Sequence, residues 1–383
     1  MTQISCIVYP PTVDYDYMPQ RPQHLMKEFS NMQIPAYYMN INLFKKRKGI
    51  EQINPYFFLF NDVNIKPFLK NSRPVIYFSL PDHINMVKQY KPSLLVFDSI
   101  DEPSEEFAGW RQHYRRALLL ADVVLASSDK LYRMAASVNE NTYLIPNACD
   151  YEYFSQALTA KLGLPEDMNG FSGPVIGFMG AIASWCDLEL LDRLATNFPD
   201  CNIILLGPLY NVQRKQVPAR SNIHWLGIKD YKDLPAYLQA FDVGIIPFKL
   251  SSMIESVNPI KMWEYLAAGL PVVSTAFPEA QKHRDVVLYS ENEAEFMENI
   301  NIALYEDSPE KQALRLELAR QNSWKSRARQ IISIIENELA QKPYYQSANL
   351  FSLPEKLSQK DTPNLKLTFR ATGARFACKN ATY

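Results

Sequence analysis

Short runs of consecutive apolar residues alternate with segments of helical periodicity along most of this chain. Runs such as VIYF (75–78), LLVF (94–97) and IILL (203–206) are apolar at every position rather than at every second one. Strands that are apolar on both faces are typical of parallel sheets that carry helices on both sides. The pattern therefore predicts an α/β chain built on doubly wound parallel sheets.

The alternation predicts two such units in succession, separated by the loop-like segment EDMNGFSGP (166–174). In the first unit we expect strands near 4–10, 34–39, 74–80, 93–99, 122–128 and 142–147, and helices near 21–32, 81–90, 103–120 and 129–138. In the second we expect strands near 174–181, 202–208, 222–227, 243–248, 271–275 and 286–290, and helices near 187–197, 230–240, 259–268 and 293–305. The expected domains are 1–155 and 170–310. A C-terminal helix and a basic tail follow at 311–383, and one interpretation is that they cross back to the first domain.

Glycine is scarce and unevenly distributed, with only 12 in 383 residues. Residues 1–108 hold one of them, whereas residues 163–269 hold nine. Glycine is needed where the backbone bends sharply or approaches a ligand closely. A bound phosphate or nucleotide is therefore expected in the second domain. The first βα turn contains no glycine, which argues against a dinucleotide-binding oxidoreductase.

Charge and cysteine content narrow the class of protein further. The formal net charge is −1, which argues against a nucleic-acid-binding surface. The five cysteines form no metal-like cluster, which favours a reducing compartment. Neither a signal peptide nor an apolar stretch long enough to span a membrane is visible. We therefore expect a cytoplasmic protein.

The segment SVNPIKMWEYLAAGLPVVST (256–275) is punctuated like a helix that starts at a cleft. Asn258 is expected as the N-cap with Pro259 at the first helical position, and Gly269 follows the end. The free N–H groups of such a start bind anions. Lys261 in the first turn and Glu264 on the same face would suit a diphosphate and a ribose. A surface Lys–Glu pair is the alternative interpretation.

This helix and several other segments resemble GT-B-fold glycosyltransferases of the group 1, or family 4, type. The run NPIKMWEYLAAGLPVVST resembles the donor-binding helix of that family. IPNACD (145–150), PVIGFMGAIASW (174–185) and NIHWLGIKDYKDLPAYLQAFDVGIIPF (222–248) resemble its hinge, its glycine loop and the unit before the donor helix. DSIDEP (98–103) and RPQHLM (21–26) resemble a subgroup that makes bacterial surface polysaccharides such as capsule, exopolysaccharide and teichuronic acid.

The resemblance, which covers about residues 1–305, implies two Rossmann-like domains that face each other across a cleft. The first would bind the acceptor, and the second a nucleotide-sugar that serves as co-substrate, with no further cofactor and no metal. The residues that it assigns to the donor are Gly180, Ala181, Trp185, Ile228, Lys229, Val257, Asn258, Pro259, Lys261 and Glu264. Trp185 would stack on a base or sugar, unless it is a core residue at a helix start.

Two departures from the family pattern bear on the mechanism. The first glutamate of the usual Glu-x7-Glu motif falls at Ser256, with Glu255 adjacent, and this leaves retaining or inverting chemistry open. The basic pair after the glycine loop is also missing. Lys261, or Arg21 from across the cleft, would then have to carry the phosphate charge.

Polar residues at strand ends and helix starts of the first domain are candidates for the acceptor side. Arg21, Gln23 and His24 open the first helix, and His83 follows a strand, so these four are candidates for acceptor or phosphate contact. Asp101, and after it Asp98, could take the proton of an acceptor hydroxyl, which would favour inversion. A solvated helix start and a helix cap near Pro103 are the alternatives.

Two further motifs in the first domain allow more than one interpretation. Asp14-Tyr15-Asp16 has the form of a metal-binding DxD motif, but nothing else suggests the fold that uses it. The basic cluster FKKRK (44–48) precedes the aromatic run YFFLF (56–60). This pair suits an anionic membrane surface and a lipid-linked acceptor at the inner face of the membrane, with a solvated loop before a buried strand as the alternative.

We therefore expect a metal-independent glycosyltransferase that moves a sugar from a nucleotide-sugar to a glycan or lipid-linked acceptor in cell-surface polysaccharide synthesis. A nucleotide-sugar epimerase of the same fold and a non-catalytic nucleotide-sugar-binding protein remain the alternatives. The sequence leaves the base, the sugar, the acceptor and the oligomeric state open.

Overall fold

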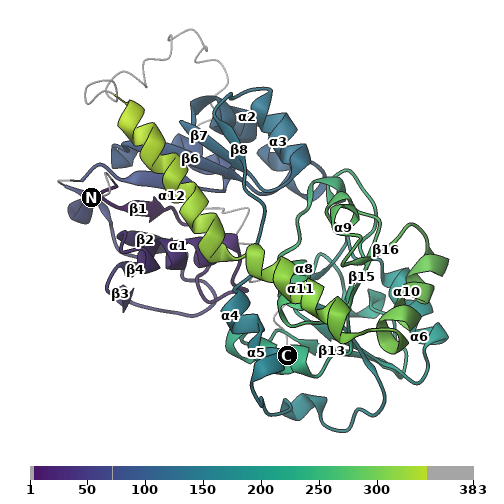
Figure 1. Cartoon of the computed structure of the whole chain (residues 1–383). Helices are drawn as coiled ribbons and strands as arrows, with labels where there is room; N and C mark the ends of the chain where they lie inside the picture. Colours follow the sequence, from purple (N-terminus) through teal and green to yellow (C-terminus); the bar gives the residue numbers. More distant parts are fainter. Residues whose placement is uncertain (1–3, 71, 343–383) are drawn as a thin grey trace.

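The computed structural model describes residues 4–70 and 72–342 and contains two large sheets, one in each half of the chain (Figure 1). The first sheet has eight strands in the order β3-β4-β2-β1-β5-β6-β7-β8, all parallel to their neighbours except the antiparallel pair β3–β4. Its strands are β1 (Ile7–Tyr9), β2 (Ala36–Asn40), β3 (Gly49–Asn54), β4 (Phe57–Asn61), β5 (Val75–Phe78), β6 (Leu94–Ser99), β7 (Val123–Ala126) and β8 (Thr142–Leu144). The helices of this half are α1 (Arg21–Asn31), η1 (Lys66–Leu69), η2 (Pro81–Asn85), η3 (Val87–Tyr90), η4 (Glu105–Trp110), α2 (Arg111–Leu120) and α3 (Asp129–Ala136).

The second sheet has six parallel strands in the order β13-β11-β9-β14-β15-β16. These strands are β9 (Val175–Met179), β11 (Asn202–Leu206), β13 (Ile223–Gly227), β14 (Val243–Ile246), β15 (Val272–Thr275) and β16 (Leu288–Ser290), and β10 (Ile182–Ala183) pairs separately with β12 (Leu209–Tyr210). The helices are α4 (Tyr151–Phe154), α5 (Gln156–Thr159), η5 (Glu166–Met168), α6 (Leu188–Asn197), η6 (Arg214–Gln216), η7 (Tyr231–Asp233), α7 (Leu234–Gln239), η8 (Ile254–Ser256), α8 (Ile260–Ala267), α9 (Pro278–Lys282), α10 (Glu293–Tyr305), α11 (Pro309–Gln321) and α12 (Trp324–Gln341). The prediction of doubly wound α/β units is confirmed.

The predicted helix at 81–90 is wrong in type, because the chain forms the two 3₁₀ helices η2 and η3 there. Its buried residues include Pro81, Ile84, Val87 and Tyr90. This spacing of three matches the three residues per turn of a 3₁₀ helix rather than the 3.6 of an α-helix. Similarly, the predicted helix at 103–120 begins as η4 before it becomes α2. The strand β3 is an addition to the predicted strands, whereas β4 corresponds to the buried strand that was the alternative interpretation of the run at 56–60.

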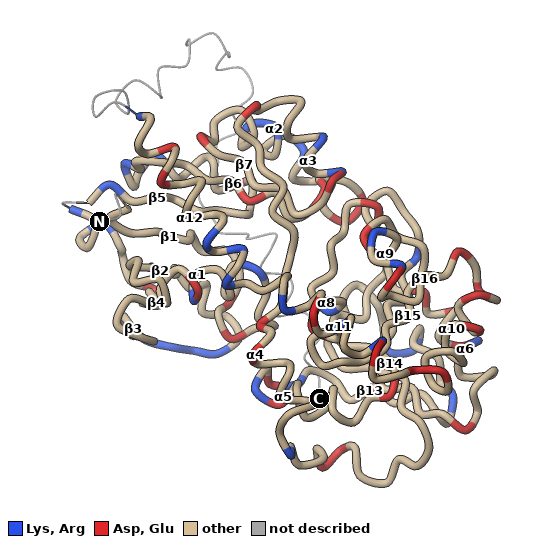
Figure 2. The backbone as a smooth tube through the Cα atoms, in the orientation of Figure 1, with Lys and Arg blue, Asp and Glu red and all other residues tan. Residues whose placement is uncertain are grey.

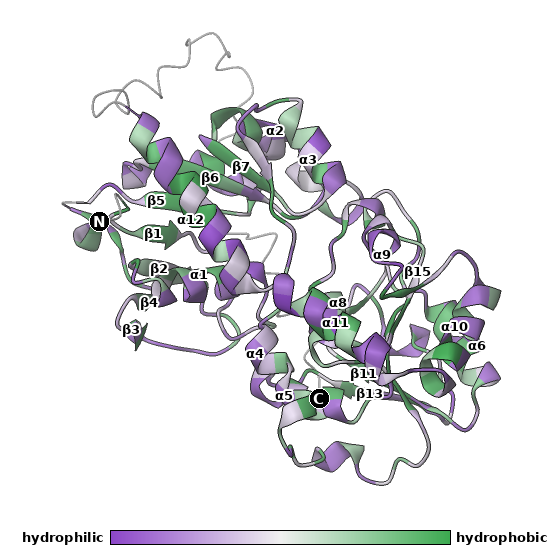
Figure 3. Cartoon of the chain, viewed as in Figure 1, coloured by the Kyte–Doolittle hydropathy of each residue, from purple (hydrophilic) through white to green (hydrophobic). Residues whose placement is uncertain are grey.

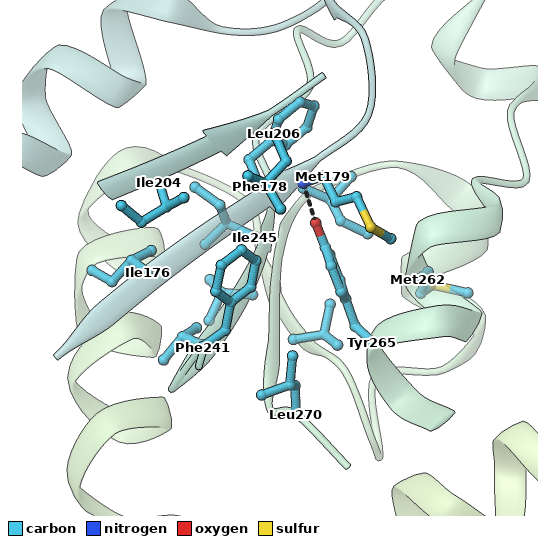
Figure 4. Packing of buried hydrophobic residues seen from close by; sticks show 14 of the residues in the cluster. Ile176, Phe178, Met179, Ile204, Leu206, Phe241, Ile245, Met262, Tyr265 and Leu270 are labelled. Carbon is cyan, nitrogen blue, oxygen red and sulfur yellow. Dashed lines mark hydrogen bonds between the residues drawn. The ribbon is translucent and has the colours of Figure 1, made fainter. Parts of the chain in front are cut away.

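Part of the glycine surplus in the second domain serves packing rather than ligand approach. Gly177 on β9 and Gly244 on β14 lie against aromatic rings, and a Cβ would fall 1.9 Å from Phe241 and 2.7 Å from Tyr265, respectively. The Tyr265 hydroxyl also accepts a hydrogen bond of 2.6 Å from the Met179 amide (Figure 4). These contacts fix α8 against the sheet, with its start at the strand ends.

The chain passes between the domains twice, and the two connecting segments lie side by side. The Cys149 amide donates to the Asn322 carbonyl, and the Trp324 amide donates to the Cys149 carbonyl, both at 3.1 Å. After the second crossing, α12 lies along the first domain (Figure 1), where its apolar residues pack into the core of the first sheet. Figure 3 shows α12 with both hydrophilic and hydrophobic positions, as expected for a helix with one buried face. The basic tail after Lys342 lies outside the described residues.

Candidate functional site

A cavity of about 330 Å³ lies between the two domains. From the second domain, the loops after β9, β11, β13 and β14 and the start of α8 line it, so it lies at the carboxyl ends of the parallel strands, where open α/β sheets bind ligands. All ten residues predicted for the donor line this cavity: Gly180, Ala181, Trp185, Ile228, Lys229, Val257, Asn258, Pro259, Lys261 and Glu264. These ten residues come from three separate segments, namely the loops after β9 and β13 and the segment that leads into and begins α8, and together they form one wall of the cavity.

Lys261 is the cation at the centre of this wall. Its Nζ lies 5.0 Å from the centre of the Phe248 ring and 5.3 Å from that of Phe178, and burial lowers its pKa. Within residues 4–70 and 72–342, no carboxylate forms an ion pair with it. Gly180 allows this approach, since a Cβ there would lie 2.6 Å from Cε of Lys261. A ligand anion would supply the missing counter-charge.

The start of α8 differs by one residue from the prediction. Pro259 is the N-cap and Ile260 the first helical residue, so Asn258 does not cap the helix. Instead, its Oδ1 accepts a hydrogen bond of 2.9 Å from Nε1 of Trp263. An indole N–H can only donate, so this bond fixes the orientation of the amide. Nδ2 of Asn258 is left buried with no protein partner in the described chain.

Glu264 lines the cavity one turn after Lys261 and is only 6% exposed. Burial raises the pKa of its carboxyl group to about 8; Asp150 adds to the rise, and Lys261 opposes it. In the unliganded protein this side chain is therefore mostly protonated at neutral pH. It can then both donate and accept a hydrogen bond, as recognition of a sugar diol requires.

The raised pKa makes Glu264 unfavourable for stability at alkaline pH. Its usual pKa is 4.5, so between pH 4.5 and about 8 the unfolded chain ionises at this position while the folded chain resists, and stability falls as the pH rises. Glu264→Gln stays neutral throughout. We expect this variant to melt at a higher temperature than the parent at pH 8 and the difference to vanish near pH 4.5. Thermal melts across this pH range measure the effect, and Glu298→Gln, on the exposed face of α10, is the control. If the melting temperatures of Glu264→Gln and the parent differed by the same amount at every pH, the raised pKa of Glu264 would be contradicted.

Arg21 and Asp98 do not contact the cavity, which corrects two of the predictions. Nε and Nη2 of Arg21 bind the two carboxylate oxygens of Asp98 at 2.7 and 3.0 Å, and both residues are 1% exposed. The Tyr77 hydroxyl also donates to Asp98. Nη1 of Arg21 binds the hinge at the Ile145 and Pro146 carbonyls. Both oxygens of the buried Asp98 thus bind protein groups, and Arg21 is already neutralised.

Arg21→Met is expected to destabilise the protein by about 3 kcal/mol or more, because it leaves a buried carboxylate without its cation. The double variant Arg21→Met/Asp98→Asn should recover much of this loss, since removing both charges together is far less costly. Denaturant unfolding of the parent, the single variant and the double variant measures both effects. Equal stability of the single variant and the parent would show that the pair is not structural.

The other candidates of the first domain are buried as well. Gln23 binds Gln20 and Asp14 through its amide, and Nε2 of His83 lies 2.9 Å from the Pro11 carbonyl. The ring of His24 stacks on Trp324 with centroids 5.3 Å apart. Burial lowers the pKa of both histidines to about 4, so both are neutral at physiological pH and cannot balance a phosphate charge. None of these three residues lines the cavity.

Asp101, in contrast, faces the donor wall from the first domain. It lines the cavity two residues after β6. Burial and the charge of Asp98 raise the pKa of its carboxyl group to about 6. In the described part of the chain, no hydrogen bond occupies this carboxylate. Of the two predicted bases, Asp101 therefore has the geometry for proton transfer.

Three further residues discussed for the donor have defined environments. Trp185 is half-buried at the cavity, with its ring 5.6 Å from that of Tyr210. Lys229 is neutralised by an ion pair with Asp167. Glu255 does not replace the missing glutamate at position 256, because its side chain is 62% exposed and pairs with Lys130 outside the cavity.

Sequence reasoning missed Tyr231 and Asn147, which also line the cavity. The Tyr231 ring stacks on Tyr153 at 5.0 Å, and its hydroxyl is buried with no partner among the described residues. Asn147 donates to the Asn258 carbonyl at 2.6 Å and accepts from Arg21, which links the hinge to the donor helix. Tyr231 lies two residues after the predicted Lys229, so a local signal was present, but the role of Asn147 depends on contacts far along the chain.

The aspartates of the DxD motif have structural partners. Oδ2 of Asp14 accepts hydrogen bonds of 2.7 Å from the amides of Leu43 and Phe44. Both oxygens of Asp16 bind Arg47. Each carboxylate therefore organises a loop of the first domain.

Known proteins with similar sequences are glycosyltransferases. Residues 173–307 match the family model described as "Glycosyl transferases group 1". A putative teichuronic acid biosynthesis glycosyltransferase, TuaH of Bacillus subtilis strain 168, is 29% identical over 231 residues, which are 57% of this chain and 57% of that protein. The chain thus spans little more than half of that relative. The resemblance to group 1 glycosyltransferases is confirmed.

Solved structures share the architecture at low sequence identity. Sucrose-phosphate synthase from Thermosynechococcus elongatus superposes with a TM-score of 0.67 at 14% identity, covering 88% of this chain and all of the other. HepE of Anabaena, solved with UDP and glucose, superposes at 0.63 and 14% identity over 87% of this chain and 99% of the other. WaaG, a glycosyltransferase of lipopolysaccharide biosynthesis, superposes at 0.59 and 14% identity over 86% and 99%. The fold is therefore GT-B, as expected.

Proposed function

We propose that this protein is a glycosyltransferase that transfers a sugar from a nucleotide-sugar to a glycan or lipid-linked acceptor in cell-surface polysaccharide synthesis. The observation that carries the proposal is Lys261, a buried cation at the start of α8 that pairs with no carboxylate of the described residues, in a cavity between two GT-B domains. The group 1 family match over this domain and the teichuronic acid relative support the reaction and the pathway class.

The residues around the cavity suggest how the transfer proceeds. The acceptor hydroxyl oxygen forms a bond to the anomeric carbon, the bond from that carbon to the diphosphate oxygen breaks, and the nucleoside diphosphate leaves with the electron pair. Lys261 and the N–H groups at the start of α8 stabilise the charge that develops on the diphosphate. Glu264 holds the ribose, and Asp101 takes the hydroxyl proton.

An epimerase and a transferase differ in whether they need an acceptor. Asp101 supports transfer, because it lies on the wall opposite the donor residues, where a second substrate has access. The test is a thermal-shift panel of nucleoside diphosphates and nucleotide-sugars, followed by turnover of the stabilising nucleotide-sugar with and without an acceptor. Conversion of the nucleotide-sugar to its epimer without acceptor would contradict the proposal, and so would stabilisation by no member of the panel.

We also propose that the first domain contacts an anionic membrane surface. Lys45, Lys46 and Lys48 are exposed, as are the apolar side chains of Phe44, which also lines the first cavity, and of Ile50 in the edge strand β3. Figure 2 shows segment 45–48 as a basic stretch next to β3. The aromatic run is mostly buried in β4 and contributes little to this surface. No helix in the described ranges is long and apolar enough to cross a bilayer.

Replacing Lys45, Lys46 and Lys48 by glutamine is expected to weaken binding to phosphatidylserine vesicles. Each basic residue near an anionic surface contributes about 1 kcal/mol, so the triple variant should bind about 100-fold more weakly. Vesicle sedimentation measures the change. The matched control replaces Lys161, Lys215 and Lys232, exposed on the second domain. Equal loss in both triple variants, or equal binding to neutral vesicles, would contradict the proposed surface.

A further inference from the structure

A second cavity, of about 110 Å³, lies within the first domain. It shares Tyr17, Gln20, Asp101 and Phe107 with the cavity between the domains. Asp101 therefore stands where the two spaces meet. A group held in the second cavity can place a reactive atom at Asp101 while a donor occupies the first.

The walls of this second cavity are mainly aromatic and apolar. Phe107 and Trp110 of η4 stack with ring centroids 4.5 Å apart and planes at 19°, and both line the cavity. Tyr9 forms a further part of the wall. Flat apolar surfaces of this kind pack closely against the C–H faces of a sugar ring through dispersion contacts.

The polar side chains in the walls are hydroxyls, the amide of Gln20 and the carboxylates of Asp14 and Asp101. The hydroxyls of Tyr9 and Ser79 share a hydrogen bond of 2.7 Å, and the Thr12 hydroxyl donates to the Pro10 carbonyl at 3.0 Å. A hydroxyl oxygen that takes part in one such bond keeps a lone pair that can accept a second hydrogen bond. Hydroxyl groups recognise hydroxyl groups without requiring a charge on the ligand.

The charges around the second cavity disfavour an anion. Asp14 and Asp101 line it, and none of the described residues that line it is Lys, Arg or His. The nearby Arg21 is already bound to Asp98. Lys229 and Lys261 line the first cavity but not the second. A phosphate here would lie near two carboxylates and no cation of the described lining. Repulsion between the negative charges would weaken its binding by about tenfold or more.

From these contacts we propose that the second cavity holds the acceptor as an uncharged sugar ring, stacked near Phe107 and Trp110 with its reactive hydroxyl at Asp101. The acceptor ring then carries neither a phosphate nor a carboxylate. This inference rests on the proposed transferase function, and it names the substrate class at the acceptor side. In the transfer, the hydroxyl oxygen bonds to the anomeric carbon, its proton passes to Asp101, and the diphosphate leaves with the electrons of the broken bond.

The test compares neutral sugars with their phosphates by ligand-observed saturation-transfer NMR on the full-length protein. The probes are methyl glycosides of glucose, galactose, N-acetylglucosamine and N-acetylgalactosamine, each paired with the corresponding 6-phosphate. We expect at least one neutral glycoside to bind and its 6-phosphate partner to bind at least about tenfold more weakly. Ser79→Arg, which adds a cation to the wall, should reverse this preference.

Two tryptophan variants localise the binding. Trp110→Ala, which removes a wall of the second cavity alone, should lose the neutral glycoside, whereas Trp185→Ala, which affects the first cavity alone, should keep it. Retained binding of a nucleoside diphosphate by Trp110→Ala shows that this variant is folded. The proposal is overturned if no neutral glycoside binds, if a 6-phosphate binds as tightly as its partner, or if Trp110→Ala binds normally.

Failure of this inference and failure of the proposed function give different results. Nucleoside diphosphate binding and donor turnover report on the first cavity, and glycoside binding reports on the second. A glycoside that binds and requires Trp110, in a protein that binds no nucleoside diphosphate, overturns the transferase function but not the ligand class of the second cavity. The reverse result overturns the ligand class alone.

Discussion

Lys261→Ala is expected to weaken the binding of a nucleoside diphosphate by about 100-fold or more, because it removes a buried charge-assisted contact to the diphosphate. Lys261 is the cation of the cavity that no described carboxylate neutralises, since Lys229 is paired with Asp167. Its burial also lowers its pKa, because the charged ammonium group is poorly solvated there, and a bound anion would offset this loss of solvation. Calorimetric titration of the parent and the variant measures the effect.

Lys249→Ala is the matched control for this prediction. Lys249 is an exposed lysine that follows Phe248, and it does not line the cavity. Its removal changes the net charge by the same amount and should leave the affinity nearly unchanged. An affinity of Lys261→Ala within a factor of about two of the parent would contradict the assigned role. Equal losses in both variants would indicate long-range attraction rather than a contact.

The donor side could be predicted from sequence because its signals are local. Pro259 and Gly269 mark the ends of one helix, and Gly180 lies directly after an apolar strand. In parallel sheets such loops converge at one edge, so short motifs far apart in the chain gather without any knowledge of their contacts. The predicted start of α8 was nevertheless one residue too early. The side-chain oxygen of Asn258 accepts a hydrogen bond from Trp263 and therefore does not cap the helix.

The acceptor side could be predicted only in part, because its polar residues are assigned by distant partners. Arg21 at a helix start suggests an exposed cation, but Asp98, 77 positions away, captures it. Similarly, His24 is covered by Trp324, which enters from the second crossing between the domains. Nothing within a few residues of Arg21 or His24 encodes these contacts. Asp101 forms no such pair within the described residues, and no sequence motif marks the second cavity beside it.

Asp101→Asn is expected to lower kcat by about 10²- to 10⁴-fold while leaving nucleoside diphosphate affinity unchanged, because an amide cannot accept the proton of the acceptor hydroxyl. The parent should also show a characteristic pH dependence. The pKa of Asp101 is about 6, and only the ionised form acts as a base, so kcat/KM should fall as the pH drops through about 6. In the variant this acidic limb should be absent from the residual activity.

Glu106→Gln provides the matched control for the loss of a carboxylate from the same segment. Glu106 is exposed, lines neither cavity and binds Ser184 and Asn211 of the second domain. Its variant should therefore retain the acidic limb, even if looser contact between the domains lowers the rate. An Asp101→Asn enzyme with the parental rate, or with an unchanged acidic limb, would show that another group receives the proton. The departing diphosphate and the other carboxylates that line the cavity, among them Glu264, would then be the groups to test.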